Sequence, residues 1–167
     1  MSEEFIAWSG MSVPEPERPT FLHPVVGILV WHVQWKWWEG TAEFKDGRRI
    51  TVRVLGSEDT ARQQRAFDYL GMLFQRVQTD DGPYRARAAR DLLPVYNRRW
   101  RDDGTDETDI DEATFQSRLA LLAIHVDTSW LRSLSATLTY SAQDMFTEHN
   151  IAVTVDKSGG PTGATLE

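Results

Sequence analysis

The sequence contains no cysteine, which excludes disulfide bonds, thiolate metal sites and a cysteine nucleophile. No apolar run approaches the roughly 20 residues that a membrane-spanning helix needs. The first five residues lack the basic and apolar regions of a secretory signal. We therefore expect a cytoplasmic protein without membrane contact.

Signatures of catalysis are missing as well. The sequence has no glycine-rich phosphate-binding loop, and its serines lack the surroundings of a nucleophile elbow. Its four histidines show none of the spacings typical of helical metal sites. We therefore predict no catalytic residues and no cofactor.

Lysine is scarce, with three lysines against fifteen arginines, and the net charge is −7. This charge makes nucleic acid an unexpected partner. The charge is also unevenly distributed. Residues 48–101 hold twelve arginines and six acids, whereas residues 102–156 hold eleven acids and two arginines. A concentrated acidic surface favours a basic protein partner, which it attracts by electrostatic steering.

The acidic segment 102–112 carries seven acids and no base. Its spacing does not match an EF-hand loop, in which acids alternate and a glycine stands at the sixth position. Three interpretations stay open: a solvated loop, an irregular cation site and a partner-binding surface. The residues predicted to bind the partner are Asp102, Asp103, Asp106, Glu107, Asp109, Asp111 and Glu112, with Tyr96 and Trp100 as aromatic anchors if they are exposed.

An alternative site lies near the C-terminus. Two histidines stand beside acids in or next to predicted strands, and these side chains are candidates to meet after folding. They would form a ligand- or divalent-metal-binding module, possibly hydrolytic, from His125, Asp127, Glu148 and His149. The four tryptophans of residues 31–38 also have two interpretations, a buried core and a stacking platform for sugars or bases, of which the core is more common.

Three prolines in residues 1–20 predict an extended lead-in, and residues 21–167 read as a single domain. Val25–Val33 is rich in branched and aromatic residues, which indicates a strand. The hydrophobic alternation continues through Trp37. Asp46-Gly47 marks the turn of a hairpin. A three-residue loop with a left-handed Gly47 pairs Ala42 with Ile50, and this register separates apolar from polar faces.

Helical spacing of apolar residues predicts a helix over 58–78 with Ser57 as its N-cap. A second helix begins at Pro83 and must kink or divide at Pro94, which has no N–H to donate. Asp109 and Glu112 resemble a capping box for a short third helix.

Strands are predicted over 121–126, 135–140 and 150–155, with an edge strand over 164–166. Hairpins, then helices, then further strands indicate an α+β fold, in which two to three helices pack on one face of an antiparallel sheet.

One further pattern is Leu92-Leu93-x-x-Tyr96-Asn97-x-x-Trp100, followed by an acidic stretch, Arg118-Leu119 and Phe146-x-x-His149-x-Ile151-x-Val153. With Trp38-x-Gly40 before a short hairpin, this order resembles an uncharacterised bacterial family of unknown function, the type numbered 2262, over residues ~24–167. The resemblance implies a small cytoplasmic binder, because such families are suspected immunity proteins of polymorphic toxin systems. The expected function is thus an immunity-like inhibitor that binds a basic effector through its acidic surface.

Overall fold

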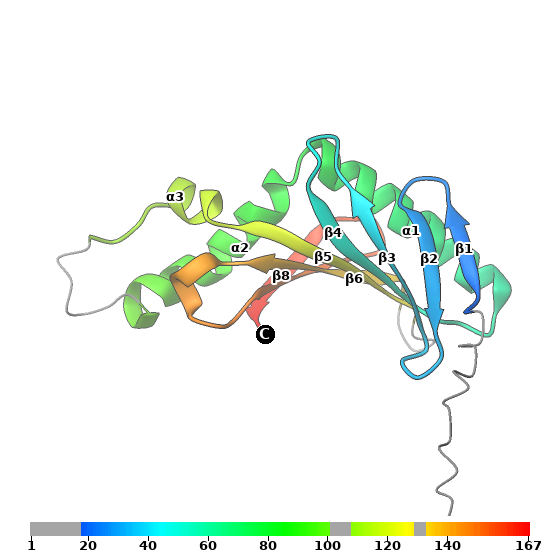
Figure 1. The fold of residues 1–167 in the computed structure, drawn as a ribbon. Coiled ribbons are helices and arrows are strands. Elements are labelled where there is room, and N and C mark those ends of the chain that lie inside the picture. The colour runs from blue at the N-terminus through cyan, green and yellow to red at the C-terminus, as the bar shows by residue number, and fades with distance from the viewer. Residues whose placement is uncertain (1–17, 101–107, 129–132) are drawn as a thin grey trace, which may run out of the picture.

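The structure is a computed structural model that describes residues 18–100, 108–128 and 133–167. Eight strands form one sheet in chain order (Figure 1). They are β1 (Thr20–His23), β2 (Gly27–His32), β3 (Trp37–Glu43), β4 (Arg49–Leu55), β5 (Ala120–Asp127), β6 (Ser135–Ser141), β7 (Ile151–Val155) and β8 (Pro161–Leu166). The four strands predicted after residue 120 are confirmed as β5 to β8.

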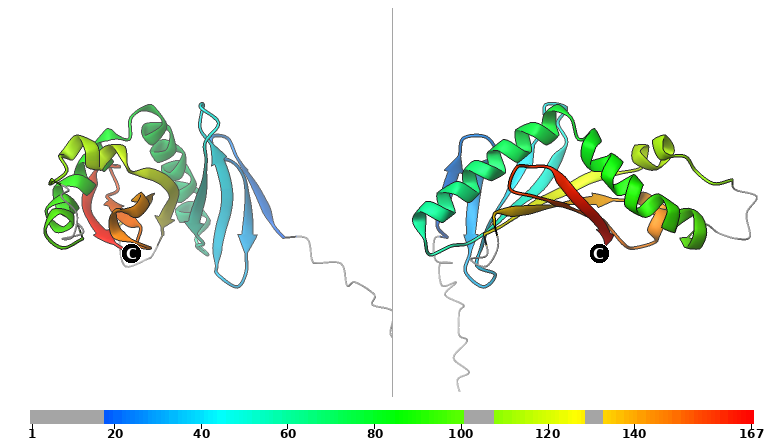
Figure 2. Two further views of the ribbon diagram at one scale, coloured as in Figure 1. Left: turned by 60° about the vertical axis from the view of Figure 1, so that its left-hand side comes forward. Right: turned by 180° about the vertical axis from the view of Figure 1, so that it is seen from behind.

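The sheet is mixed, which corrects the antiparallel prediction at one pair. Six neighbouring pairs are antiparallel, but β4 and β5 are parallel. Parallel neighbours need a long crossover connection. Here the crossover holds α1 (Thr60–Thr79), α2 (Gly82–Val95), the π-helical turn η1 (Tyr96–Trp100) and α3 (Glu112–Ser117). Seen from behind, α1 and α2 cross the sheet (Figure 2).

Alternation along the strands gives the sheet one apolar and one polar face. Val52, Ile124 and Leu138 lie side by side on three neighbouring strands and are fully buried. They belong to the same core as Leu70 and Leu73 of α1. This core therefore joins the crossover helices to the apolar face of the sheet. Among the described residues, no helix is long and apolar enough to cross a membrane.

The predicted β3–β4 hairpin is confirmed. Gly47 has a φ of +84°, and the N–H of Phe44 donates to the carbonyl of Arg48 at 2.8 Å. Ala42 lies opposite Ile50, as the separation of polar from apolar residues requires.

The strand predicted over Val25–Val33 is wrong at its N-terminal end, because a hairpin turn separates β1 from β2. His23, which lies just before Pro24, holds this turn in place. The His23 ring is buried, and its Nδ1 accepts hydrogen bonds from the backbone N–H groups of Val25 and Val26. Its Nε2 then donates to the carbonyl of Phe67 at 2.8 Å, which ties the turn to α1. β1 begins at Thr20, within the predicted lead-in.

The first two helices are confirmed, but two caps differ from prediction. The N-cap of α1 is Asp59, whose side chain accepts from the N–H of Arg62, whereas the Ser57 hydroxyl accepts from Asp59. The N-cap of α3 is Asp111 and not Asp109. Pro94 lies inside α2, and the chain continues directly into the π-helical turn η1, so the helix changes its hydrogen-bond pattern there.

Two buried tyrosines differ in whether their hydroxyl groups have a partner. The Tyr84 hydroxyl of α2 donates to the carbonyl of Gly159 in the β7–β8 turn at 2.9 Å. The Tyr140 hydroxyl of β6 is buried and has no hydrogen-bond partner in the part of the chain that the structure describes, and burial raises its pKa.

We predict opposite effects of removing these hydroxyl groups. Tyr84→Phe leaves a carbonyl without its donor and is expected to lower the free energy of unfolding by about 1 kcal/mol. Tyr140→Phe removes an unsatisfied buried group, so it is expected to leave that free energy unchanged or raise it. Urea denaturation of both variants checks this, and a larger loss in Tyr140→Phe would contradict it.

Candidate functional site

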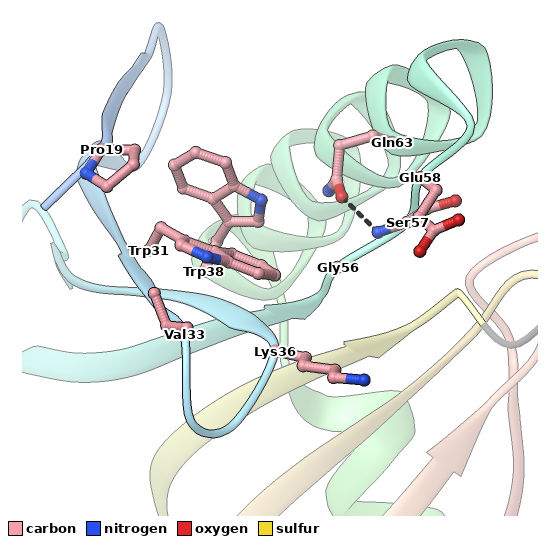
Figure 3. Close-up of a pocket in the computed structure, with 9 residues that line it drawn as sticks. All are labelled: Pro19, Trp31, Val33, Lys36, Trp38, Gly56, Ser57, Glu58 and Gln63. Atoms are coloured by element: carbon pink, nitrogen blue, oxygen red, sulfur yellow. Dashed lines mark hydrogen bonds between the residues drawn. The ribbon is translucent and has the colours of Figure 1, made fainter.

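A pocket of about 550 Å³ lies between the β2–β3 turn and the start of α1 (Figure 3). Volumes of this size are typical of sites for small molecules or peptide side chains. We call it the tryptophan pocket. Its lining residues are Pro19, Trp31, Val33, Lys36, Trp38, Gly56, Ser57, Glu58 and Gln63.

The aromatic wall consists of Trp31 and Trp38. They lie directly opposite each other on β2 and β3, and their ring centroids are 5.3 Å apart at an angle of 52°. Trp38 also packs edge-on against Phe67 of α1, with ring centroids 5.8 Å apart. The core thus fixes Trp38, and Trp38 in turn supports Trp31 at the pocket.

Gly56 makes room for Trp31 where the chain leaves β4. A Cβ atom at residue 56 would collide with the Trp31 ring and would lie 2.9 Å from the carbonyl oxygen of Lys36. The Gly56 N–H donates to this carbonyl at 2.8 Å, which holds the two segments close together. A glycine is therefore needed here for close approach rather than for an unusual backbone angle.

Gln63 supplies the polar group of the pocket. Its side-chain oxygen accepts a hydrogen bond from the backbone N–H of Ser57 at 2.8 Å (Figure 3). This contact fixes the amide orientation, because the reverse orientation would set two donors against each other. The amide nitrogen is therefore turned away from Ser57, and it is buried without a hydrogen-bond partner among the described residues. An unsatisfied buried donor costs about 1–3 kcal/mol, which an acceptor on a bound molecule would offset.

The charged groups of the pocket are Lys36 and Glu58, and both are exposed. The Ser57 hydroxyl accepts from the N–H of Asp59. The pocket combines an apolar wall, the buried amide donor of Gln63 and opposite charges at the mouth, an arrangement typical of ligand sites.

The structure separates the four residues of the alternative metal site. His125 lies in register with Thr137 of β6, which lies opposite Thr154 of β7. His149 precedes β7 and is five residues from Thr154, about 16 Å along an extended strand. The His149 ring packs edge-on against Trp100, 5.7 Å between centroids. Within the described ranges, no three His, Asp or Glu residues gather as a metal site would require.

His125 instead belongs to a cluster on the polar face of the sheet. Its ring packs edge-on against Trp37, and Arg53 lies next to it on β4 and over the Trp37 ring. Arg53 also forms an ion pair with Glu39. Burial, reinforced by the positive charge of Arg53, lowers the pKa of His125.

The acidic surface is described only in part. Asp109, Asp111 and Glu112 are exposed. Asp111 caps α3 by accepting from the N–H of Thr114, and its interactions with the Thr114 side chain and backbone lower its pKa. Part of this cluster therefore has a structural role, as a helix cap. The remaining predicted residues, Asp102, Asp103, Asp106 and Glu107, lie outside the described residues.

One of the two predicted aromatic anchors is not exposed. Tyr96 is 7% exposed and packs edge-on against Phe146, so it is a core residue. Trp100 is half-buried, between Phe146 and His149. The Asn97 side chain bonds both the N–H and the carbonyl of Ile110, which closes the base of the acidic segment beside Trp100.

The sequence did not reveal the tryptophan pocket. An uninterrupted strand through Trp37 would place Trp31 and Trp38 on opposite faces of the sheet. The turn at residues 33–36 reverses the chain and brings them to the same face. The sequence did not indicate the role of Gln63, because a glutamine exposed on a helix and a glutamine that bonds the preceding loop cannot be told apart from sequence alone.

Comparison with known proteins adds a family and no activity. A family model described as "Uncharacterized protein conserved in bacteria (DUF2262)" matches residues 23–166. No curated protein and no solved structure matches the chain.

The lowered pKa of His125 predicts a pH dependence of stability. The unfolded chain binds a proton near the ordinary pKa of 6.5, which the folded protein binds only at lower pH. The stability is therefore fully present above that value and decreases as the pH falls below it. Wild type should lose stability relative to His125→Asn between about pH 7.5 and pH 5. Denaturation curves across this range check this, and equal losses in both proteins would contradict it.

Proposed function

We propose that this chain, which belongs to the bacterial family DUF2262, is a protein-binding domain whose partner inserts an apolar segment into the tryptophan pocket. The pocket carries the proposal, because it joins two tryptophans to an unpartnered amide donor. Tryptophan side chains contribute large contact areas at little cost in conformational entropy, and they dominate many interfaces.

The rim of the pocket supports a protein partner. Val33 is 72% exposed at its edge, and Trp35 is 57% exposed in the same β2–β3 turn. Trp35 stacks on Trp37, with ring centroids 5.6 Å apart. Val33 thus lies at the pocket itself, whereas Trp35 packs on Trp37 toward the other face of the sheet. Exposed apolar side chains next to a pocket are typical of interaction sites. A partner that covers this turn would bury them together with the pocket.

The acidic surface supports a second candidate, the immunity-like inhibitor of a basic effector. Asp109, Asp111 and Glu112, the acids of this surface within the described residues, are exposed at the end of the molecule that carries α3. This end is opposite β1 and β2 in Figure 1. Charges concentrated at one end would accelerate association with a basic partner, and salt would reduce that acceleration. The two candidates therefore use different ends of the molecule.

Site-specific photocrosslinking in a lysate of the source bacterium tests the first candidate against the second. A photoreactive residue replaces Val33 at the pocket, Thr108 at the acidic end or Leu122 on the sheet. Leu122 is 42% exposed and serves as the matched control. We expect a discrete adduct from position 33 that is missing from position 122. An adduct from position 108 alone would overturn the pocket proposal in favour of the acidic surface.

A further inference from the structure

We infer that the segment bound by the tryptophan pocket contains proline in the polyproline II conformation, and that Gln63 binds one of its backbone carbonyl groups. This inference rests on the proposed function, since it specifies the chemistry of the partner.

The structure already places one proline in this pocket. Pro19 contributes to the lining together with Trp31 (Figure 3). The carbonyl of Pro19 accepts from the N–H of Trp31 at 2.9 Å, which fixes the proline next to the base of the aromatic side chain. The pocket is therefore compatible with a pyrrolidine ring, and a second proline would meet an apolar wall made by Pro19, Trp31 and Trp38.

The unpartnered amide of Gln63 specifies what lies beside that proline. Its two N–H groups need an acceptor, and the contact with Ser57 prevents the side chain from presenting its oxygen instead. A polyproline II segment has no internal hydrogen bonds, so all its carbonyl groups are free to accept. A bound α-helix would present few, because its carbonyl groups are satisfied internally except in the last turn.

The charges at the mouth add a preference for the flanking residues. Lys36 and Glu58 are both exposed and line the same pocket. Flanking residues of both signs would find complementary charges there, with the modest energies typical of exposed pairs. The aromatic wall, the donor and the mixed charges together match the grooves through which proline-rich ligands are recognised.

Nuclear magnetic resonance on the full ¹⁵N-labelled chain tests this inference. The probe is a blocked polyproline peptide of about nine residues, and the control is a glycine–serine peptide of the same length. We expect the polyproline peptide to shift the indole N–H signals of Trp31 and Trp38 and the side-chain amide of Gln63. No shift at about millimolar peptide, or equal shifts with the glycine–serine peptide, would overturn the inference.

Gln63→Glu tests the donor, because it keeps an oxygen for the Ser57 N–H and removes the two amide N–H groups. We expect it to weaken peptide binding by at least about tenfold. Gln75→Glu introduces the same charge at an exposed position of α1 and should leave the affinity within about twofold. Val33→Glu, at the exposed rim, should also weaken binding while the fold is kept. Unchanged affinity in both Gln63→Glu and Val33→Glu would overturn the assignment.

Two other outcomes identify a different occupant. If the peptide binds only after Pro14 and Pro16 are replaced by alanine, the lead-in of this chain occupies the pocket. That result would overturn the inference that a partner segment binds there. A crosslink at position 33 without peptide binding would overturn the inference alone and leave the proposed function standing. If neither the crosslink at position 33 nor peptide binding is observed, both the inference and the proposed function are overturned.

Discussion

The parallel pairing of β4 with β5 is the constraint on which the rest of the structure depends. Every other pair of neighbouring strands is joined by a local connection, but this pair requires residues 56–119 to cross from one strand to the next. The crossover supplies the helices that bury the apolar face of the sheet. Its connections include the exit from β4 and the segment that links η1 to α3.

Both candidate surfaces lie at these two places. The tryptophan pocket forms where Gly56, Ser57 and Gln63 lead from β4 into α1. The acidic segment follows η1, where Asn97 ties the returning chain at Ile110. Binding residues are often found on connections that a rigid scaffold positions. In this protein the scaffold is the packed core, and the connections are the two ends of one crossover.

Local patterns predicted local structure well. The β3–β4 register followed from the separation of apolar and polar residues onto opposite faces of the hairpin. The helical spacing of apolar residues located α1 and α2. The parallel pair was missed because a buried strand shows its apolar face and not the direction of its neighbour. Tyr96 was named as a partner anchor only on the condition that it is exposed, and the structure buries it in the core. The pocket depended on the turn at residues 33–36, which no proline or glycine marks.

The central claim is that Trp31 forms the pocket because residue 56 has no side chain. The most direct test is Gly56→Ala, examined through the indole N–H signal of Trp31 and through thermal denaturation. Displacement of this ring by the added methyl group should shift the Trp31 signal strongly and destabilise the protein by about 1–3 kcal/mol, as expected for overpacking. The Trp37 signal, on the opposite face of the sheet, should stay in place. An unmoved Trp31 signal with unchanged stability would contradict the account.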